Sequence, residues 1–175
     1  MNRVDSLAIT IRPLTSQDAE SYSALRRQIA AESCIGLGLT LDEELARPIQ
    51  EFADQLASPL PNIMLGAFDG STLIATAGIA RASARQSGVH KAVLWGVLTS
   101  PAYRRRSLAH TLSTGVIEHA CATGAERVCL YVYLPNEPAV RLYEALGFVT
   151  TSVEPEVVKI DGVYHDLQQM SRRYV

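Results

Sequence analysis

Residues 92–109 read AVLWGVLTSPAYRRRSLA in the one-letter code. The apolar run at the start is typical of a buried strand, a proline then ends it, and a helical pattern of small residues begins at Ser107. Arg104, Arg105 and Arg106 stand between the two patterns. The first N–H groups of a helix have no intrahelical partner and carry a partial positive charge, so they bind phosphate groups, and flanking arginines add full charges. This stretch therefore predicts an anion-binding turn between a strand and a helix.

The composition is that of one globular domain spanning residues 1–175. Hydrophobic residues make up 47% of the chain and charged residues 19%, which is enough for a sizeable core. The net charge of −2 argues against a nucleic-acid-binding protein, so the arginine run is a local feature. No run approaches the ~20 apolar residues that span a bilayer. We therefore expect neither nucleic acid nor a membrane as a partner.

The cysteines and histidines do not predict a metal site. Cys34, Cys121 and Cys129 have no metal-ligand spacing. Their odd number and the short apolar content of residues 1–7 favour reduced thiols in a cytoplasmic protein without a signal peptide. His110 lies one turn into the predicted helix, where it could contact an anion, and we interpret it as a neutral surface residue.

Hydrophobic periodicity predicts strands and helices in the first half of the chain. The predicted strands are 7–11, 63–68 and 72–80, the last two joined by a hairpin at Asp69-Gly70. A first helix starts at Thr15 and continues through Ile29, and a glycine-containing stretch then ends it. Thr40 and Glu43 form a capping-box pattern for a second helix to about residue 56, which Pro48 interrupts.

The second half of the chain continues with alternating strands and helices. After the strand at 92–98, the predicted elements are a helix at 107–123, a strand at 128–134, a helix at 136–146 and a hairpin of strands 157–160 and 163–167. Hairpins at both ends, with strand–helix units between them, indicate a mixed α+β fold with helices on the sheet faces.

Two motifs identify a family. Residues 104–109 resemble the loop Gln/Arg-x-x-Gly-x-Gly/Ala of the GNAT superfamily of N-acetyltransferases, and residues 136–148 closely match its motif Asn-x-x-Ala-x-x-x-Tyr-x-x-x-Gly-Phe. The C-terminal stretch at 161–166 also looks like the last hairpin of the family. The resemblance covers essentially the whole chain. It implies a central mixed, mostly antiparallel sheet of about six or seven strands, splayed between the fourth and fifth strands, with helices on both faces.

The resemblance implies acetyl-coenzyme A as the cosubstrate and no metal. Its diphosphate is expected on the backbone N–H groups of residues 105–109, and its pantetheine arm along the end of the preceding strand. The implied cosubstrate-binding residues are Val97, Leu98, Thr99, Arg104, Arg105, Arg106, Ser107, Leu108, Ala109 and Asn136. Ser107 and Arg105 stand where the family commonly has glycine. The hydroxyl of Ser107 could cap the helix or donate to a phosphate.

The roles of Tyr143 and Asn136 have two interpretations each. In the family, the tyrosine at this motif position often acts as general acid toward the departing thiolate, and the asparagine often contacts the coenzyme arm. Helical spacing alone would make Tyr143 a core residue and Asn136 an ordinary N-cap. Trp95 is either core or a wall of the acceptor pocket.

The general base for the acceptor amine is not evident. A lysine-like amine is mostly protonated at pH 7, which costs roughly 4–5 kcal/mol, whereas an α-amino group costs only about 1 kcal/mol. No Asp or Glu stands between Gln86 and Glu118, so the strand before the loop offers no carboxylate. Either the base comes from elsewhere, with Glu32, Asp42 and Glu43 as candidates by location, or the acceptor is weakly basic.

These observations predict an N-acetyltransferase that acts on an amine of a small molecule or peptide by direct attack in a ternary complex. The alternatives are a non-catalytic acetyl-coenzyme A sensor of the same fold, or an interaction module whose arginines bind an acidic partner. The sequence does not decide the oligomeric state, although the apolar final strands could pair across a homodimer.

Overall fold

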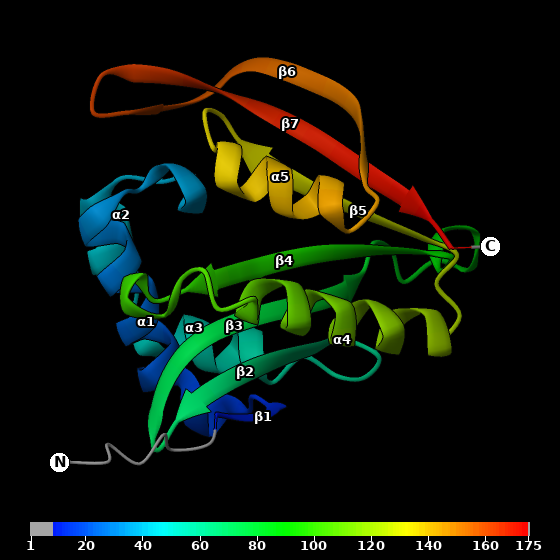
Figure 1. Ribbon diagram of the computed structural model, residues 1–175, viewed down its shortest axis with the longest axis horizontal. Helices are drawn as coiled ribbons and strands as arrows, with labels where there is room; N and C mark the ends of the chain where they lie inside the picture. Colours follow the sequence, from blue (N-terminus) through cyan, green and yellow to red (C-terminus); the bar gives the residue numbers. More distant parts are fainter. Residues whose placement is uncertain (1–8, 175) are drawn as a thin grey trace, which may run out of the picture.

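The computed structural model describes residues 9–174, which form one seven-stranded sheet flanked by helices (Figure 1). The strands are β1 (Thr10–Pro13), β2 (Ile63–Asp69), β3 (Thr72–Arg81), β4 (Lys91–Thr99), β5 (Arg127–Tyr133), β6 (Val149–Ile160) and β7 (Val163–Arg173). They lie in the order β1-β2-β3-β4-β5-β7-β6, and only β4 and β5 are parallel neighbours. The predicted mixed, mostly antiparallel sheet is therefore confirmed. The predicted lack of a signal peptide in residues 1–7 and the first two residues of the predicted strand 7–11 fall on residues 1–8, which lie outside the described residues.

The helices cover both faces of the sheet, as predicted. They are α1 (Ala19–Glu32), α2 (Leu41–Ala46), α3 (Ile49–Leu56), α4 (Leu108–Ala122) and α5 (Glu137–Ala145), with short 3-10 turns η1 (Ser16–Asp18), η2 (Ile35–Leu37), η3 (Gln86–Gly88) and η4 (Pro101–Tyr103). One buried cluster joins α4 and α5 to the sheet, and another joins α1 and α3 to the opposite face. We call these the α4 face and the α1 face. Pro48 separates α2 from α3, as the sequence predicts.

The sheet splays between β4 and β5. The two strands pair over three residues only, from Lys91–Val93 against Arg127–Cys129, and they diverge beyond that point (Figure 1). A bulge at Gly96 bends β4, since φ there is +59° and the register with β3 shifts by one residue. The Thr76 hydroxyl donates to the displaced Gly96 carbonyl at 2.7 Å. A bulge increases local bending and twist, so it directs the end of β4 away from β5.

The C-terminal hairpin is much longer than predicted. Its turn is at Asp161-Gly162, where both residues have positive φ, as the sequence indicates. However, β6 begins at Val149 rather than at residue 157. Because β6 is the edge strand and exposes almost all its side chains, its sequence lacks the apolar run that marks a buried strand. The predicted homodimer through these strands stays a prediction.

Candidate active site

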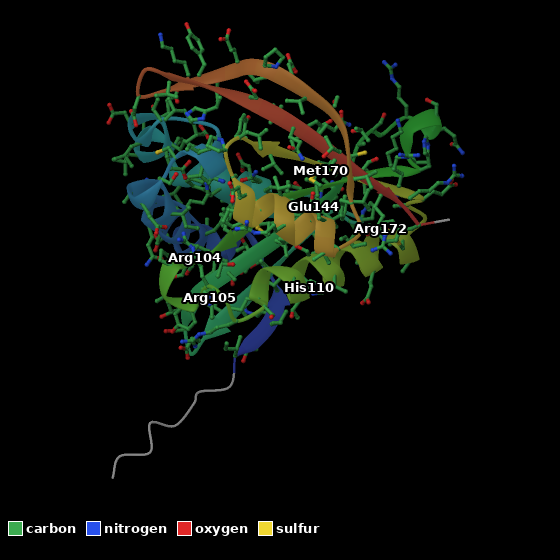
Figure 2. All side chains as sticks on the ribbon, turned by 45° about the horizontal axis from the view of Figure 1, so that its top comes forward. Arg104, Arg105, His110, Glu144, Met170 and Arg172 are labelled. Carbon is green, nitrogen blue, oxygen red and sulfur yellow. The ribbon has the colours of Figure 1, made fainter. Side chains whose placement is uncertain are left out.

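A cleft of about 1120 Å³ opens where β4 and β5 diverge. Its walls come from the end of α1, the turn η2, the end of β4, the loop before α4, the side of β5 and the start of α5. Figure 2 shows Arg104 and Arg105 on the loop near α1, and His110 on the first turn of α4. Nearly all the residues predicted to bind the cosubstrate line this cleft: Val97, Leu98, Thr99, Arg104, Arg105, Ser107, Leu108, Ala109 and Asn136. The fold therefore brings together segments that are almost 40 residues apart in the chain.

The loop before α4 has two residues in the left-handed region. Arg105 has a φ of +63° and Ser107 a φ of +59°, and both stand where the related family motif commonly has glycine. Only glycine adopts this conformation without steric cost. Ser107 occupies the N-cap position of α4, but its side chain makes no capping hydrogen bond. The predicted capping role of the hydroxyl is therefore wrong, and the first N–H groups of α4 are left for other partners.

The three arginines have different environments. The guanidinium of Arg104 makes an ion pair with Glu32 at the end of α1. Arg105 lines the cleft. Arg106 does not line it, and its guanidinium lies over the ring of Tyr103, 4.9 Å from the centroid. Arg104 and Arg105 are thus the arginines placed to meet an anion in the cleft.

The end of β4 forms one long wall of the cleft. Val97 packs against the α4-face cluster and Leu98 is buried in the α1-face cluster. Beyond Val93 the strand has no ladder partner on the β5 side, so its backbone groups on that side lie along the opening. The hydroxyl of Thr99 is buried without a hydrogen-bond partner in the part of the chain that the structure describes.

Tyr143 is both a core residue and a cleft residue. Its side chain is 8% exposed, contacts Phe148 edge-to-face at 6.2 Å between ring centroids, and lines the cleft. Its hydroxyl has no hydrogen-bond partner within residues 9–174. Burial raises the pKa of this phenol well above its ordinary value, so the hydroxyl stays protonated and available as a donor.

Asn136 is an N-cap residue that also lines the cleft. Its Oδ1 accepts a hydrogen bond from the backbone N–H of Ala139 at 3.3 Å, which confirms the N-cap interpretation. The side chain also lines the cleft. Because the cap uses only the oxygen, the two N–H donors of the amide remain for a ligand.

Tyr131 and Tyr133 of β5 also line the cleft, although neither was predicted as a site residue. Tyr131 is 51% exposed, and the ring of Tyr133 packs so closely on Gly38 that a Cβ there would lie 2.2 Å from it. The signal was present in the Tyr-Val-Tyr alternation, because residues either side of the buried Val132 must face the opposite way. Both rings therefore belong to the α1 face of the splayed sheet.

The structure separates the three carboxylates considered as bases. Glu32 lines the cleft, whereas Asp42 and Glu43 do not. Glu43 accepts from the backbone N–H of Thr40 in the capping box of α2, and this bond lowers its pKa. Trp95 packs, partly buried, against the α1-face cluster and is absent from the wall of this cleft, which favours its core interpretation.

Thiol and metal chemistry have little support in the described residues. Cys34 is buried, its thiol donates to the carbonyl of Ala30 at 3.3 Å, and burial raises its pKa. A thiol with a raised pKa is a poor nucleophile at neutral pH. Within residues 9–174, no group of three or more His, Cys, Asp or Glu side chains is arranged to hold a metal ion. Nor does that part of the chain contain a helix long and apolar enough to cross a bilayer.

The sequence range that contains the cleft residues matches a known protein family. The model of the Acetyltransferase (GNAT) family matches residues 28–148. The chain belongs to this GNAT family. The matched range contains every residue that lines the cleft, from Ile29 to Tyr143, so the family signal and the geometric site coincide.

Two named acetyltransferases match part of the chain. The mycothiol acetyltransferase of Corynebacterium glutamicum (strain R) is 48% identical over 59 residues, which are 34% of this chain and 20% of that protein. The phosphinothricin N-acetyltransferase of Streptomyces viridochromogenes is 34% identical over 71 residues, which are 41% of this chain and 39% of that protein. The chain thus matches less than half the length of either relative. These matches support acetyl transfer in general and do not identify the acceptor.

Solved GNAT structures share the fold over nearly the whole chain. An acetyltransferase of the GNAT family from Streptococcus pneumoniae superposes with a TM-score of 0.82 at 25% identity, covering 95% of this chain and all of that one. A phosphinothricin acetyltransferase from Sinorhizobium meliloti, solved in complex with AcCoA, has a TM-score of 0.81 at 17% identity, covering 94% and 88%. The arrangement of strands and helices is therefore that of the GNAT fold.

Proposed function

We propose that this protein transfers the acetyl group of acetyl-coenzyme A to an amine of a small molecule or peptide, by direct attack in a ternary complex. The observation that carries the proposal is the cleft between β4 and β5. It has a helix start without a side-chain cap and with arginines at one end, a tyrosine with a raised pKa inside, and an aromatic wall toward the α1 face. One opening thus offers a place for each of the two substrates.

The cleft residues fit two parts of the cosubstrate, its diphosphate and its pantetheine arm. The unpaired N–H groups at the start of α4, with Arg104 and Arg105, suit a diphosphate. The unpaired backbone of β4 beyond Val93, and the buried unpartnered hydroxyl of Thr99, suit the amides of a pantetheine arm. Two proteins of similar fold, from Salmonella typhimurium and Sinorhizobium meliloti, have structures solved with acetyl-coenzyme A bound.

The proposed chemistry uses few protein groups. Acetyl-coenzyme A supplies an activated thioester, and the amine forms a C–N bond to its carbonyl carbon while the C–S bond breaks. The amine loses one proton and the departing sulfur gains one, so the products are an amide and a thiol. We assign the backbone N–H near Leu98 to the carbonyl oxygen, where negative charge develops. We assign the hydroxyl of Tyr143 to the departing sulfur.

The amine must be deprotonated before it attacks, and the structure offers few acceptors for that proton. β4 contains no carboxylate, and the carboxylates that line the cleft are Glu32 and Glu137, of which Glu137 is paired with Arg141. The proton therefore leaves through water, with or without Glu32, or the acceptor binds as a weakly basic amine. The three free cysteines agree with the reducing cytoplasm, where we propose that the reaction takes place.

A non-catalytic acetyl-coenzyme A sensor is the second candidate. It is favoured by the missing strand carboxylate and by two non-glycine residues in the left-handed loop before α4. The two candidates share the same binding site but differ in turnover. A panel of amines, with release of the coenzyme A thiol as the readout, separates them.

The experiment pairs this screen with calorimetry using coenzyme A. Binding together with acceptor-dependent thiol release supports the transferase. Binding without release from any amine supports the sensor. Absence of binding by the wild-type protein overturns both.

A further inference from the structure

An ion pair crosses the mouth of the cleft. Glu32 is the last residue of α1, and Arg104 lies 72 positions later in the loop before α4. Nη1 of Arg104 donates to Oε1 of Glu32 at 2.9 Å, and Nη2 donates to Oε2. Their side chains are 45% and 47% exposed, and both residues line the cleft. The pair therefore connects the predicted phosphate-binding loop to the wall opposite it.

Glu32 depends on Arg104 for a counter-charge. The C-terminal end of a helix carries a partial negative charge, so a carboxylate there is unfavourable unless a cation lies nearby. The last turn of α1 contains no basic residue. In residues 9–174, Arg104 is the one cation within ion-pair distance of Glu32. If Arg104 moves away, the cleft is left with an uncompensated carboxylate.

The surroundings of Glu32 suit a positively charged, partly apolar molecule. Of the described residues that line the cleft from α1, η2 and the segment between them, Glu32 alone carries a charge. The facing strand β5 contributes Tyr131 and Tyr133 to the same wall. Aromatic rings and a carboxylate together bind ammonium groups. Among the described residues that these elements contribute to the cleft, no basic side chain is present to bind an acidic acceptor.

The phosphates of the cosubstrate compete for the same arginine. Arginine binds phosphate through paired N–H donors, as it binds carboxylate. An exposed ion pair is weak, whereas a diphosphate at the start of α4 also has the helix N–H groups and Arg105 to hold it. Arg104 can therefore exchange Glu32 for a phosphate at low cost.

We propose that Glu32 is the specificity-determining residue for the acceptor, and that it binds the ammonium group of a cationic acceptor after Arg104 has turned to the cosubstrate phosphates. This inference rests on the proposed function and adds an acceptor class, a cationic amine with an apolar or aromatic body. It also couples the two substrates, because Glu32 is released for the acceptor when the phosphates hold Arg104.

The first test measures coenzyme A binding by calorimetry at low salt. Glu32→Gln removes the competing charge, so we expect coenzyme A to bind about two- to five-fold more tightly than to the wild-type protein. Glu20→Gln, at the other end of α1 and away from the cleft, makes the same change in net charge and should leave the affinity unchanged. In an Arg104→Gln background, Glu32→Gln should have no further effect.

The second test measures binding of phenethylamine, with 2-phenylethanol as its neutral counterpart. The wild-type protein should bind the amine about two- to five-fold more tightly with saturating coenzyme A than without it, since the coupling is reciprocal. Arg104→Gln should bind the amine equally well in both conditions. Glu32→Gln should lose the preference for the amine over the alcohol.

The outcomes distinguish this inference from the proposed function. If Glu32→Gln binds coenzyme A as the wild type does, or if phenethylamine shows no coupling to coenzyme A, the exchange is overturned while acetyl transfer stands. If the wild-type protein fails to bind coenzyme A at all, the proposed function itself fails.

Discussion

Replacing Ser107 with glycine tests the phosphate-binding loop most directly. Ser107 has φ +59° and ψ +13°, a conformation that costs an L residue roughly 1–2 kcal/mol. Glycine removes this cost, but it makes the unfolded chain more flexible, which lowers the free energy of unfolding by about 0.4–1 kcal/mol. Since the serine side chain makes no capping bond, losing it at the N-cap destabilises the protein by only roughly 0.2 kcal/mol. The balance runs from a destabilisation of about 0.2 kcal/mol to a stabilisation of about 1.4 kcal/mol.

Thermal unfolding and calorimetry give the two readouts. A gain near the middle of that range, about 0.6 kcal/mol, raises Tm by roughly 1–2 °C in a domain of this size. Because the Cβ no longer stands beside the approaching diphosphate, coenzyme A should also bind more tightly. Ser107→Ala is the matched control, since it keeps the Cβ and removes only the hydroxyl. If the hydroxyl donates to a phosphate, the alanine variant binds coenzyme A several-fold more weakly.

One result would refute this reasoning. A Ser107→Gly variant with a Tm lowered by more than about 2 °C and an unchanged affinity for coenzyme A would show that the left-handed conformation is neither strained nor close to the phosphates. The assignment of the loop as the diphosphate site would then lose its structural basis.

Three further predictions concern catalysis, binding and stability. Tyr143→Phe should lower kcat about 10-fold or more with little change in coenzyme A affinity, and unchanged turnover would remove the phenol from the mechanism. Ala109→Asp places a negative charge at the start of α4 and should weaken coenzyme A binding at least about 10-fold, so wild-type affinity by calorimetry would contradict the binding site. Glu44 is fully buried and accepts from Arg26 at 2.7 and 2.8 Å, so Glu44→Gln should cost about 3–5 kcal/mol. Denaturant unfolding measures this cost, with Glu51→Gln in an exposed pair expected to cost less than about 1 kcal/mol.

The fold was predictable where local signals agree with tertiary demands. The helix after Asn136 has its N-cap, its apolar face and Gly147 in one short motif, and α5 ends within one residue of the prediction. The strand at 92–98 is a continuous apolar run that is buried against helices on both faces. By contrast, β6 pairs on one side only, and its exposed side chains carry no periodic signal.

The site was predictable where its residues lie in short continuous motifs. Residues of the two motifs line the cleft because each motif is a continuous stretch next to a strand end. The contact between Glu32 and Arg104 joins positions 72 residues apart, and no local pattern specifies such a distance. Gly96 did contain a signal, since a glycine within a strand marks a bulge, and the bulge explains how the cleft opens.

The three residue pairs that join β4 to β5 have a mechanical consequence. They are the only backbone ladder between the N-terminal and C-terminal parts of the sheet in the described residues, and beyond them the two parts are joined by the side chains of the α4-face cluster. A molecule inserted along the free end of β4 would bridge the two parts as a surrogate strand. Amide hydrogen exchange at Val97–Thr99 should then slow on coenzyme A binding.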